Sequence, residues 1–159
     1  MRTSITALLL VLGVSSAAAE DIGSVDTAFK WLGANHKIVV EVFDDPSIEG
    51  VSCYLSRAKT GGISGSLGIA EDTSDASVAC RQVGESITIK NPIKQTEQVF
   101  TERASILFKN IHVVRMVDEK RKVLTYLVYS NKFIDGSPKN SITAVPLPGN
   151  VNLAVSLKK

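Results

Sequence analysis

The chain has 159 residues, with 18 Lys and Arg against 16 Asp and Glu, and its formal net charge is +2. Positive and negative side chains are mixed along the sequence, so the overall composition gives no electrostatic footprint for nucleic acid or for an anionic membrane. The length suits one domain, and the sequence contains no internal repeat that would indicate a second.

Residues 1–19 have the pattern of a secretory signal peptide. Arg2 precedes a largely apolar run over residues 5–14, and the small side chains of residues 15–19 suit cleavage after Ala19. The apolar run is about ten residues long, shorter than the roughly 20 that cross a bilayer as a helix. We therefore expect an exported, periplasmic protein without a membrane span, in which residues 20–159 form a single β-rich domain.

The first part of this predicted domain alternates between polar and apolar residues. Residues 22–32 fit either a helix or a strand, and we favour a strand that reverses at residues 33–36 into the β-branched run 38–43. A turn signal, Asp-Asp-Pro at residues 44–46, ends that run, and residues 51–56 follow as another strand.

Further strands are predicted in the second part of the chain. Residues 104–117 indicate one long strand, with a bulge or tight turn where its phase breaks at residues 109–110. The charged residues 118–122 reverse the chain into residues 123–130, whose two apolar faces indicate a central strand. Residues 141–147 predict an edge strand, because prolines confine it to an edge or a terminus.

Six to eight strands at this spacing predict the fold class. We expect a mainly β protein, a single-domain antiparallel sandwich or barrel with one disulfide. At most one or two short helices fit the pattern, and the one helix candidate besides residues 22–32 lies within residues 66–80.

The two cysteines, Cys53 and Cys80, lie on the apolar faces of two alternating segments. Thiols of exported proteins oxidise, so we expect a buried structural disulfide between them. The Cys-x-x-Cys spacing of redox-active pairs is absent. A lipid anchor is not expected either, since it needs a cysteine at the cleavage site.

Between the cysteines, residues 57–75 are rich in glycine and carry both charge signs. Residues 56–59 and 59–61 match two motifs of penicillin-recognising enzymes, but those enzymes need two separate lysines and here one would serve both. Residues 62–66 lack the final glycine of a nucleophile elbow. The glycines also follow the lysine, whereas a phosphate-binding loop has them before it. We therefore assign no catalytic residue.

Metal and cofactor sites are not predicted. Glu71, Asp72 and Asp75 offer carboxylate oxygens but lack the spacing of a calcium loop, so we interpret the acidic run as a helix or turn cap. The two histidines, His36 and His112, fall short of the three protein ligands of a catalytic zinc site. We expect neither a bound metal nor a cofactor.

Long strings of the chain resemble the CreA family of exported bacterial proteins. They are residues 22–27, 36–46, 53–84 and 136–140, and the resemblance spans residues 22–147. It implies a periplasmic protein of the Gram-negative type and a domain of this extent. It implies no catalytic residue, ligand or activity.

These observations favour a non-enzymatic binding or envelope-accessory module, with a small molecule or an envelope protein as partner. An enzyme that uses residues 57–75 is the alternative, and a structural interaction protein, marked by an exposed apolar patch or an open sheet edge, is a third. Convergence of the charged residues on one cavity would favour a site. We expect Arg57 and Lys59 to be exposed and dispensable for folding, with pairing between Lys59 and Asp72 as the competing interpretation. The predicted ligand-binding residues are Arg57, Lys59, Gly61, Gly62, Asp72 and Asp75.

Overall fold

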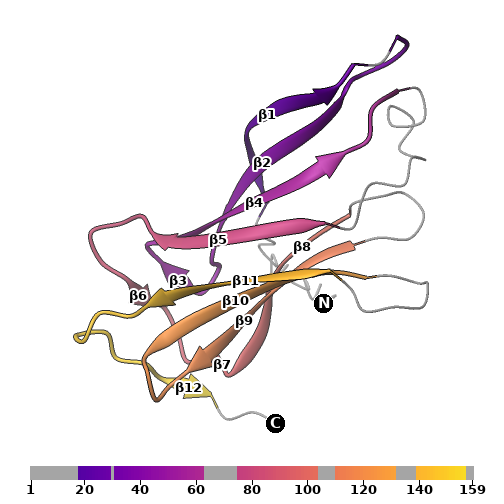
Figure 1. Ribbon diagram of the computed structural model, residues 1–159. Coiled ribbons are helices and arrows are strands. Elements are labelled where there is room, and N and C mark those ends of the chain that lie inside the picture. Colours follow the sequence, from indigo (N-terminus) through magenta and orange to yellow (C-terminus); the bar gives the residue numbers. More distant parts are fainter. Residues whose placement is uncertain (1–17, 30, 63–74, 104–109, 132–138, 157–159) are drawn as a thin grey trace, which may run out of the picture.

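Two four-stranded antiparallel sheets form the protein (Figure 1). The structure is a computed structural model that describes residues 18–29, 31–62, 75–103, 110–131 and 139–156. The first sheet has the order β1-β2-β4-β5 and the second the order β11-β10-β9-β8, while β3 pairs with β6 and β7 with β12. The strands are β1 (Glu20–Ala28), β2 (His36–Asp44), β3 (Ile48–Glu49), β4 (Val51–Lys59), β5 (Ala76–Gln82), β6 (Thr88–Ile89), β7 (Ile93–Lys94), β8 (Thr96–Arg103), β9 (Asn110–Asp118), β10 (Val123–Ser130), β11 (Asn140–Pro146) and β12 (Val155–Ser156).

The two sheets pack face to face around one hydrophobic core. Every second residue of a strand points inward, and the inward Leu55 on β4, Val113 on β9 and Leu124 on β10 are fully buried. The stacked rings of Phe43 and Phe100, with centroids 4.2 Å apart, join β2 to β8. Of the two predicted forms, a sandwich or a barrel, the protein adopts the sandwich.

The predicted disulfide lies inside this core. Cys53 on β4 stands directly opposite Cys80 on β5 in the antiparallel ladder, and their sulfur atoms are bonded. Both residues are buried, at 0% and 4% exposure. The expected structural disulfide is therefore confirmed, and it links two strands that are already neighbours in one sheet.

Strands β5 and β11 bring the edges of the two sheets together (Figure 1). The backbone N–H of Val78 on β5 donates a hydrogen bond to the Ser141 hydroxyl on β11 at 3.1 Å. Strand β11 is an edge strand and β10 a central strand of the second sheet, as their sequence patterns predict. Among the described residues, no paired strands join the opposite ends of the two sheets, at β1 and β8.

The β1–β2 hairpin leads away from the second sheet (Figure 1). All nine residues of β1 are exposed, whereas the inward side chains of β2 enter the core from Val39 onward. The turn between the strands includes Gly33, whose φ of 85° lies in the left-handed region. Residues 22–28 are therefore strand, which settles the ambiguity of residues 22–32 in favour of the hairpin.

Two details of the sequence-based prediction are tested only in part. Of the long strand predicted over residues 104–117, the structure describes the part from Asn110, which is β9 and pairs antiparallel with a preceding strand, β8, while residues 104–109 lie outside the described residues. The helix candidate within residues 66–80 gives way to strand β5 from Ala76 onward, and residues 66–74 lie outside the described residues. Within the described part of the chain, no helix is long and apolar enough to cross a membrane.

Candidate functional site

The inward face of β4 changes from apolar to charged toward the end of the strand. Val51, Cys53 and Leu55 are buried in the core, and the next inward residue along the strand is Arg57, which is only 5% exposed. A buried guanidinium needs partners of opposite charge, because desolvation otherwise disfavours the charged form. The prediction that Arg57 is an exposed charge is therefore wrong.

Two glutamates, one from each sheet, pair with Arg57. Its Nε donates to Oε2 of Glu41 on β2 at 3.0 Å, and its terminal nitrogen donates to Glu41 Oε1 at 3.1 Å. The same nitrogen forms an ion pair with Glu102 on β8. Lys59, two residues farther along β4, donates to Glu41 Oε1 at 3.2 Å. We call these four residues, Arg57, Lys59, Glu41 and Glu102, the Arg57 cluster.

The two glutamates of this cluster have opposite pKa shifts. Burial acts to raise the pKa of Glu41, but hydrogen bonds and positive charge from Arg57 and Lys59 outweigh it and lower that pKa below 4.5. Burial raises the pKa of Glu102 above 4.5, Arg57 opposes the shift, and the neighbouring Glu41 carboxylate adds to it. Glu102 Oε2 is buried and has no hydrogen-bond partner among the described residues. Glu102 thus takes up a proton more readily than Glu41.

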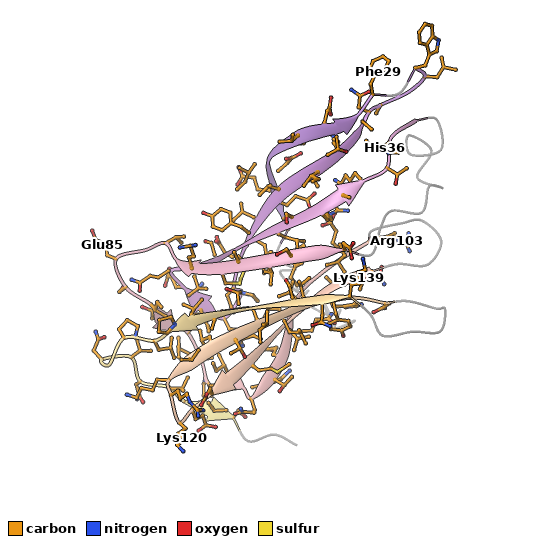
Figure 2. The ribbon with its side chains drawn as sticks, viewed as in Figure 1. Phe29, His36, Glu85, Arg103, Lys120 and Lys139 are labelled. Carbon is orange, nitrogen blue, oxygen red and sulfur yellow. A yellow bond between two sulfur atoms is a disulfide. The ribbon has the colours of Figure 1, made fainter. Side chains whose placement is uncertain are left out.

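A groove of about 500 Å³ lies beside this cluster. Arg57, a member of the cluster, is also one of the residues that line the groove. Lys139 and Asp75, which also line it, form an exposed ion pair with 2.7 Å between Nζ and Oδ2. Figure 2 shows Lys139 at the end of the sandwich where β5 and β11 run side by side. The lining combines small apolar side chains with hydroxyl, amide and charged groups: Ile38, Ser56, Arg57, Ala58, Asp75, Ala76, Ser77, Lys139 and Asn140.

The predicted site residues separate into three groups. Arg57 and Asp75 line the groove, whereas Lys59 lies in the Arg57 cluster with its amine on Glu41. The proposed Lys59–Asp72 pair cannot be placed, because Asp72 lies outside the described residues. Two of the four predicted charges therefore converge on one cavity, and a third, Lys59, lies in the cluster next to it.

Gly61 and Gly62 support a neighbouring turn. The Gly62 N–H donates to the Ala34 carbonyl at 2.6 Å, and the Gly61 N–H donates to His36 Nδ1 at 2.9 Å. A side chain on Gly61 would collide with the backbone of residues 34–35, and Gly62 has a φ of 83°. Close backbone approach therefore explains both glycines.

The geometry of the groove and the cluster can be set beside known proteins. The family model described as "CreA protein" matches residues 22–150 of the chain. The chain belongs to the CreA family. It is 57% identical over 146 residues to Protein CreA of Escherichia coli strain K12, an alignment that covers 90% of this chain and 93% of that protein. The Protein CreA sequences of E. coli strains O6:H1 and O157:H7 match with the same identity and coverage. No solved structure matches this CreA family chain at a significant level.

Sequence reasoning missed a second buried cluster near the opposite end of the sandwich. Arg115 on β9 is completely buried and donates to both Asp45 oxygens, at 2.6 and 2.7 Å. Its other terminal nitrogen pairs with Glu97 at 2.5 Å, and the Tyr126 hydroxyl donates to Asp45 at 2.8 Å. Burial, together with the Asp45 charge and hydrogen bond, raises the pKa of Tyr126. We call these four residues the Arg115 cluster.

The described residues contain no group of three His, Cys, Asp or Glu side chains that could hold a metal ion. His36 accepts the Gly61 hydrogen bond, and His112 lies 2.8 Å from Gln98 and stacks on Tyr129. Of the acidic run weighed as a calcium site, the structure describes Asp75 alone, and that carboxylate pairs with Lys139.

Proposed function

We propose that this CreA family protein is exported to the periplasm, with cleavage after Ala19, and acts there as a non-enzymatic binding module. Its ligand is a small molecule that carries both charge signs, bound in the groove beside the Arg57 cluster. The leader pattern of residues 1–19 and the disulfide support export, because disulfides persist in oxidising compartments.

One observation carries the binding proposal: a buried arginine borders a groove that an exposed ion pair also lines. The partners of Arg57 hold its guanidinium in a fixed position. Asp75 and Lys139, at 54% and 67% side-chain exposure, are solvated and pair only with modest strength. A zwitterionic ligand can replace this ion pair by two ion pairs of its own. A volume of about 500 Å³ lies within the usual range for small-molecule sites.

A thermal-shift screen of amino acids and short peptides tests the proposal. We expect some members to raise the Tm of the wild-type protein, because a ligand that binds the folded state stabilises it by mass action. Lys139→Ala and Asp75→Ala should each reduce that shift strongly. Native mass spectrometry of protein purified from the periplasmic fraction should reveal any ligand that remains bound.

The chain offers a matched control for this screen. Arg121 and Asp118 form another exposed ion pair, with 2.8 Å between Nη1 and Oδ2. Arg121→Ala should retain the full thermal shift. Equal loss in Arg121→Ala and Lys139→Ala, or no shift from any zwitterion in the wild-type protein, would refute binding in the groove.

The glutamate pair supports a second candidate function, an enzyme that moves protons. Neighbouring carboxyl groups whose pKa values are driven apart are an arrangement used for general acid–base work. Here Glu102 is the acid and Glu41 the carboxylate. An enzyme would convert the molecule that binds in the groove, so mass spectrometry after incubation with each hit separates the two functions. Recovery of unchanged ligand favours the binding module.

Export has its own test. Intact-mass measurement of protein from the periplasmic fraction should give a chain that begins at Glu20. A chain that keeps residues 1–19, or one confined to the cytoplasm, would contradict the proposed location. It would not bear on the proposal that the groove binds a ligand.

A further inference from the structure

The turn of the β1–β2 hairpin carries the two most exposed large apolar side chains of the described residues, Trp31 and Phe29, with the exposed Leu32 beside them. Trp31 is 90% exposed, Phe29 79% and Leu32 64%. Figure 2 shows Phe29 at the far end of the hairpin, away from the rest of the sandwich. We call these three residues the hairpin tip. Large exposed apolar groups that gather at one place mark an interaction surface.

The turn segment carries net positive charge. No acidic residue occurs from residue 27 to residue 40, and this stretch contains Lys30 and Lys37. The nearest acid toward the N-terminus, Asp26, lies opposite Lys37 in the hairpin ladder and accepts a hydrogen bond from the Asn35 amide at 2.8 Å. The nearly balanced charge of the whole chain does not reveal this local excess of positive charge. Its charge complements an anionic surface.

The tip is held on a braced turn. Ala34 pairs with Gly62 through an isolated β-bridge, and a side chain on Gly33 would collide with the Gly62 backbone. Gly61, hydrogen-bonded to His36, completes the brace. These contacts fix the base of the turn before any partner arrives, which lowers the ordering cost of docking.

We propose that the hairpin tip docks into the headgroup region of an anionic phospholipid bilayer. Trp, with an apolar ring and a polar N–H, is the side chain typical of that region, and Phe and Leu enter the acyl boundary beside it. The positive charge of the segment, to which Lys37 on β2 contributes, attracts the lipid phosphates. The inference is independent of the groove, since none of the three tip residues lines it. It gives the protein a peripheral attachment to the membrane surface without a spanning segment.

Trp31 makes the test direct, because it is the one tryptophan of the chain. Its fluorescence is measured as the protein is titrated with vesicles of equal parts phosphatidylglycerol and phosphatidylcholine. We expect the emission maximum to move to shorter wavelength and the protein to float with the vesicles. On vesicles of phosphatidylcholine alone, the affinity should be at least about tenfold lower, because each lysine near an anionic surface adds to binding.

Matched variants distinguish binding through the hairpin tip from nonspecific binding through other exposed apolar side chains. Phe29→Ser combined with Leu32→Ser keeps the fluorescent reporter and should weaken vesicle binding at least about tenfold. Val83→Ser combined with Ile142→Ser removes two apolar side chains of 55% and 67% exposure elsewhere, and should leave binding unchanged. Circular dichroism checks that each variant is folded. Intact mass checks that residues 1–19, which would bind lipid themselves, are absent.

Three results would overturn the proposal. They are an unchanged wild-type emission spectrum with anionic vesicles, equal binding by the two double variants, and a wavelength shift that depends on protein concentration in the absence of lipid. The last result, with a dimer in sedimentation equilibrium, would show that a second copy of the chain covers the tip. Loss of ligand binding at the groove would leave the lipid result unaffected, so the two proposals fail separately.

Discussion

The sandwich contains two arginine clusters of similar chemistry and different access to water. The side chains of Arg115 and Asp45 are completely buried, and the Tyr126 hydroxyl donates a hydrogen bond to Asp45. The Arg57 cluster has an extra cation, Lys59, at 35% side-chain exposure. Arg57 lines the groove that contains the Lys139–Asp75 ion pair, whereas Asp45 of the Arg115 cluster borders a separate groove of about 440 Å³.

This comparison teaches that burial alone does not mark a site. In the Arg115 cluster, the Asp45 carboxylate receives two hydrogen bonds from the guanidinium, one from Tyr126 and one from the Ser47 backbone N–H at 2.9 Å. Such a network specifies how the strands pack. In the Arg57 cluster, the pKa values of the two glutamates shift in opposite directions. Each cluster keeps one buried polar atom without a partner among the described residues, Glu102 Oε2 in one and Arg115 Nε in the other. We assign structure to the first cluster and binding to the second.

The largest effect is expected from opening the Arg115 cluster. Arg115→Met removes the partner of Asp45 while it roughly keeps the side-chain volume, and it should cost about 3–5 kcal/mol of the free energy of unfolding, because a buried carboxylate loses its counter-charge. Urea denaturation measures the loss. A variant as stable as the wild type would show that the cluster does not hold the sheets together.

A smaller loss is expected from the corresponding change in the other cluster. Arg57→Met leaves Glu41 with Lys59, and Glu102 in partial contact with solvent at 28% side-chain exposure, so we expect a cost of about 1–3 kcal/mol. The protein should fold and lose zwitterion binding. If Arg57→Met is more damaging to stability than Arg115→Met, the division into a structural and a functional cluster is wrong.

The dependence of stability on pH sharpens the contrast further. Since its folded-state pKa is raised above 4.5, Glu102 favours the folded state when protonated and loses that contribution as the pH rises through the raised pKa. Glutamine cannot ionise. The Tm of Glu102→Gln relative to wild type should therefore increase as the pH rises above 4.5, which calorimetry at a series of pH values measures. A constant difference would contradict the raised pKa.

Much of the fold follows from residue patterns, as strands β2, β4, β9 and β10 illustrate. The inward position of Glu41 was readable, because Val39 and Phe43 lie on the same face of its strand. Arg115 likewise alternates with Val113 and Val117. A charge at an inward position is thus a sequence signal for a buried ion pair.

The partners of these charges were not readable. Glu102 and Glu97 lie on β8, which the pattern misses because a register shift between Gln98 and Phe100 breaks the alternation. Their ion pairs with Arg57 and Arg115 join strands that are distant in sequence, and sequence periodicity does not encode such pairing. The groove depends on the same tertiary pairing, so sequence named Arg57 and Asp75 but not Lys139.

One measurement tests the division of roles most directly. Glu97 and Glu102 lie on the same strand, have 26% and 28% side-chain exposure, and each pairs with a buried arginine. The dissociation constant of the best zwitterion from the screen is compared in Glu97→Gln and Glu102→Gln by calorimetric titration. We predict about tenfold weaker binding in Glu102→Gln, because it loosens the arginine that lines the groove, and wild-type binding in Glu97→Gln. Equal affinity in the two variants, or a loss confined to Glu97→Gln, would contradict the account.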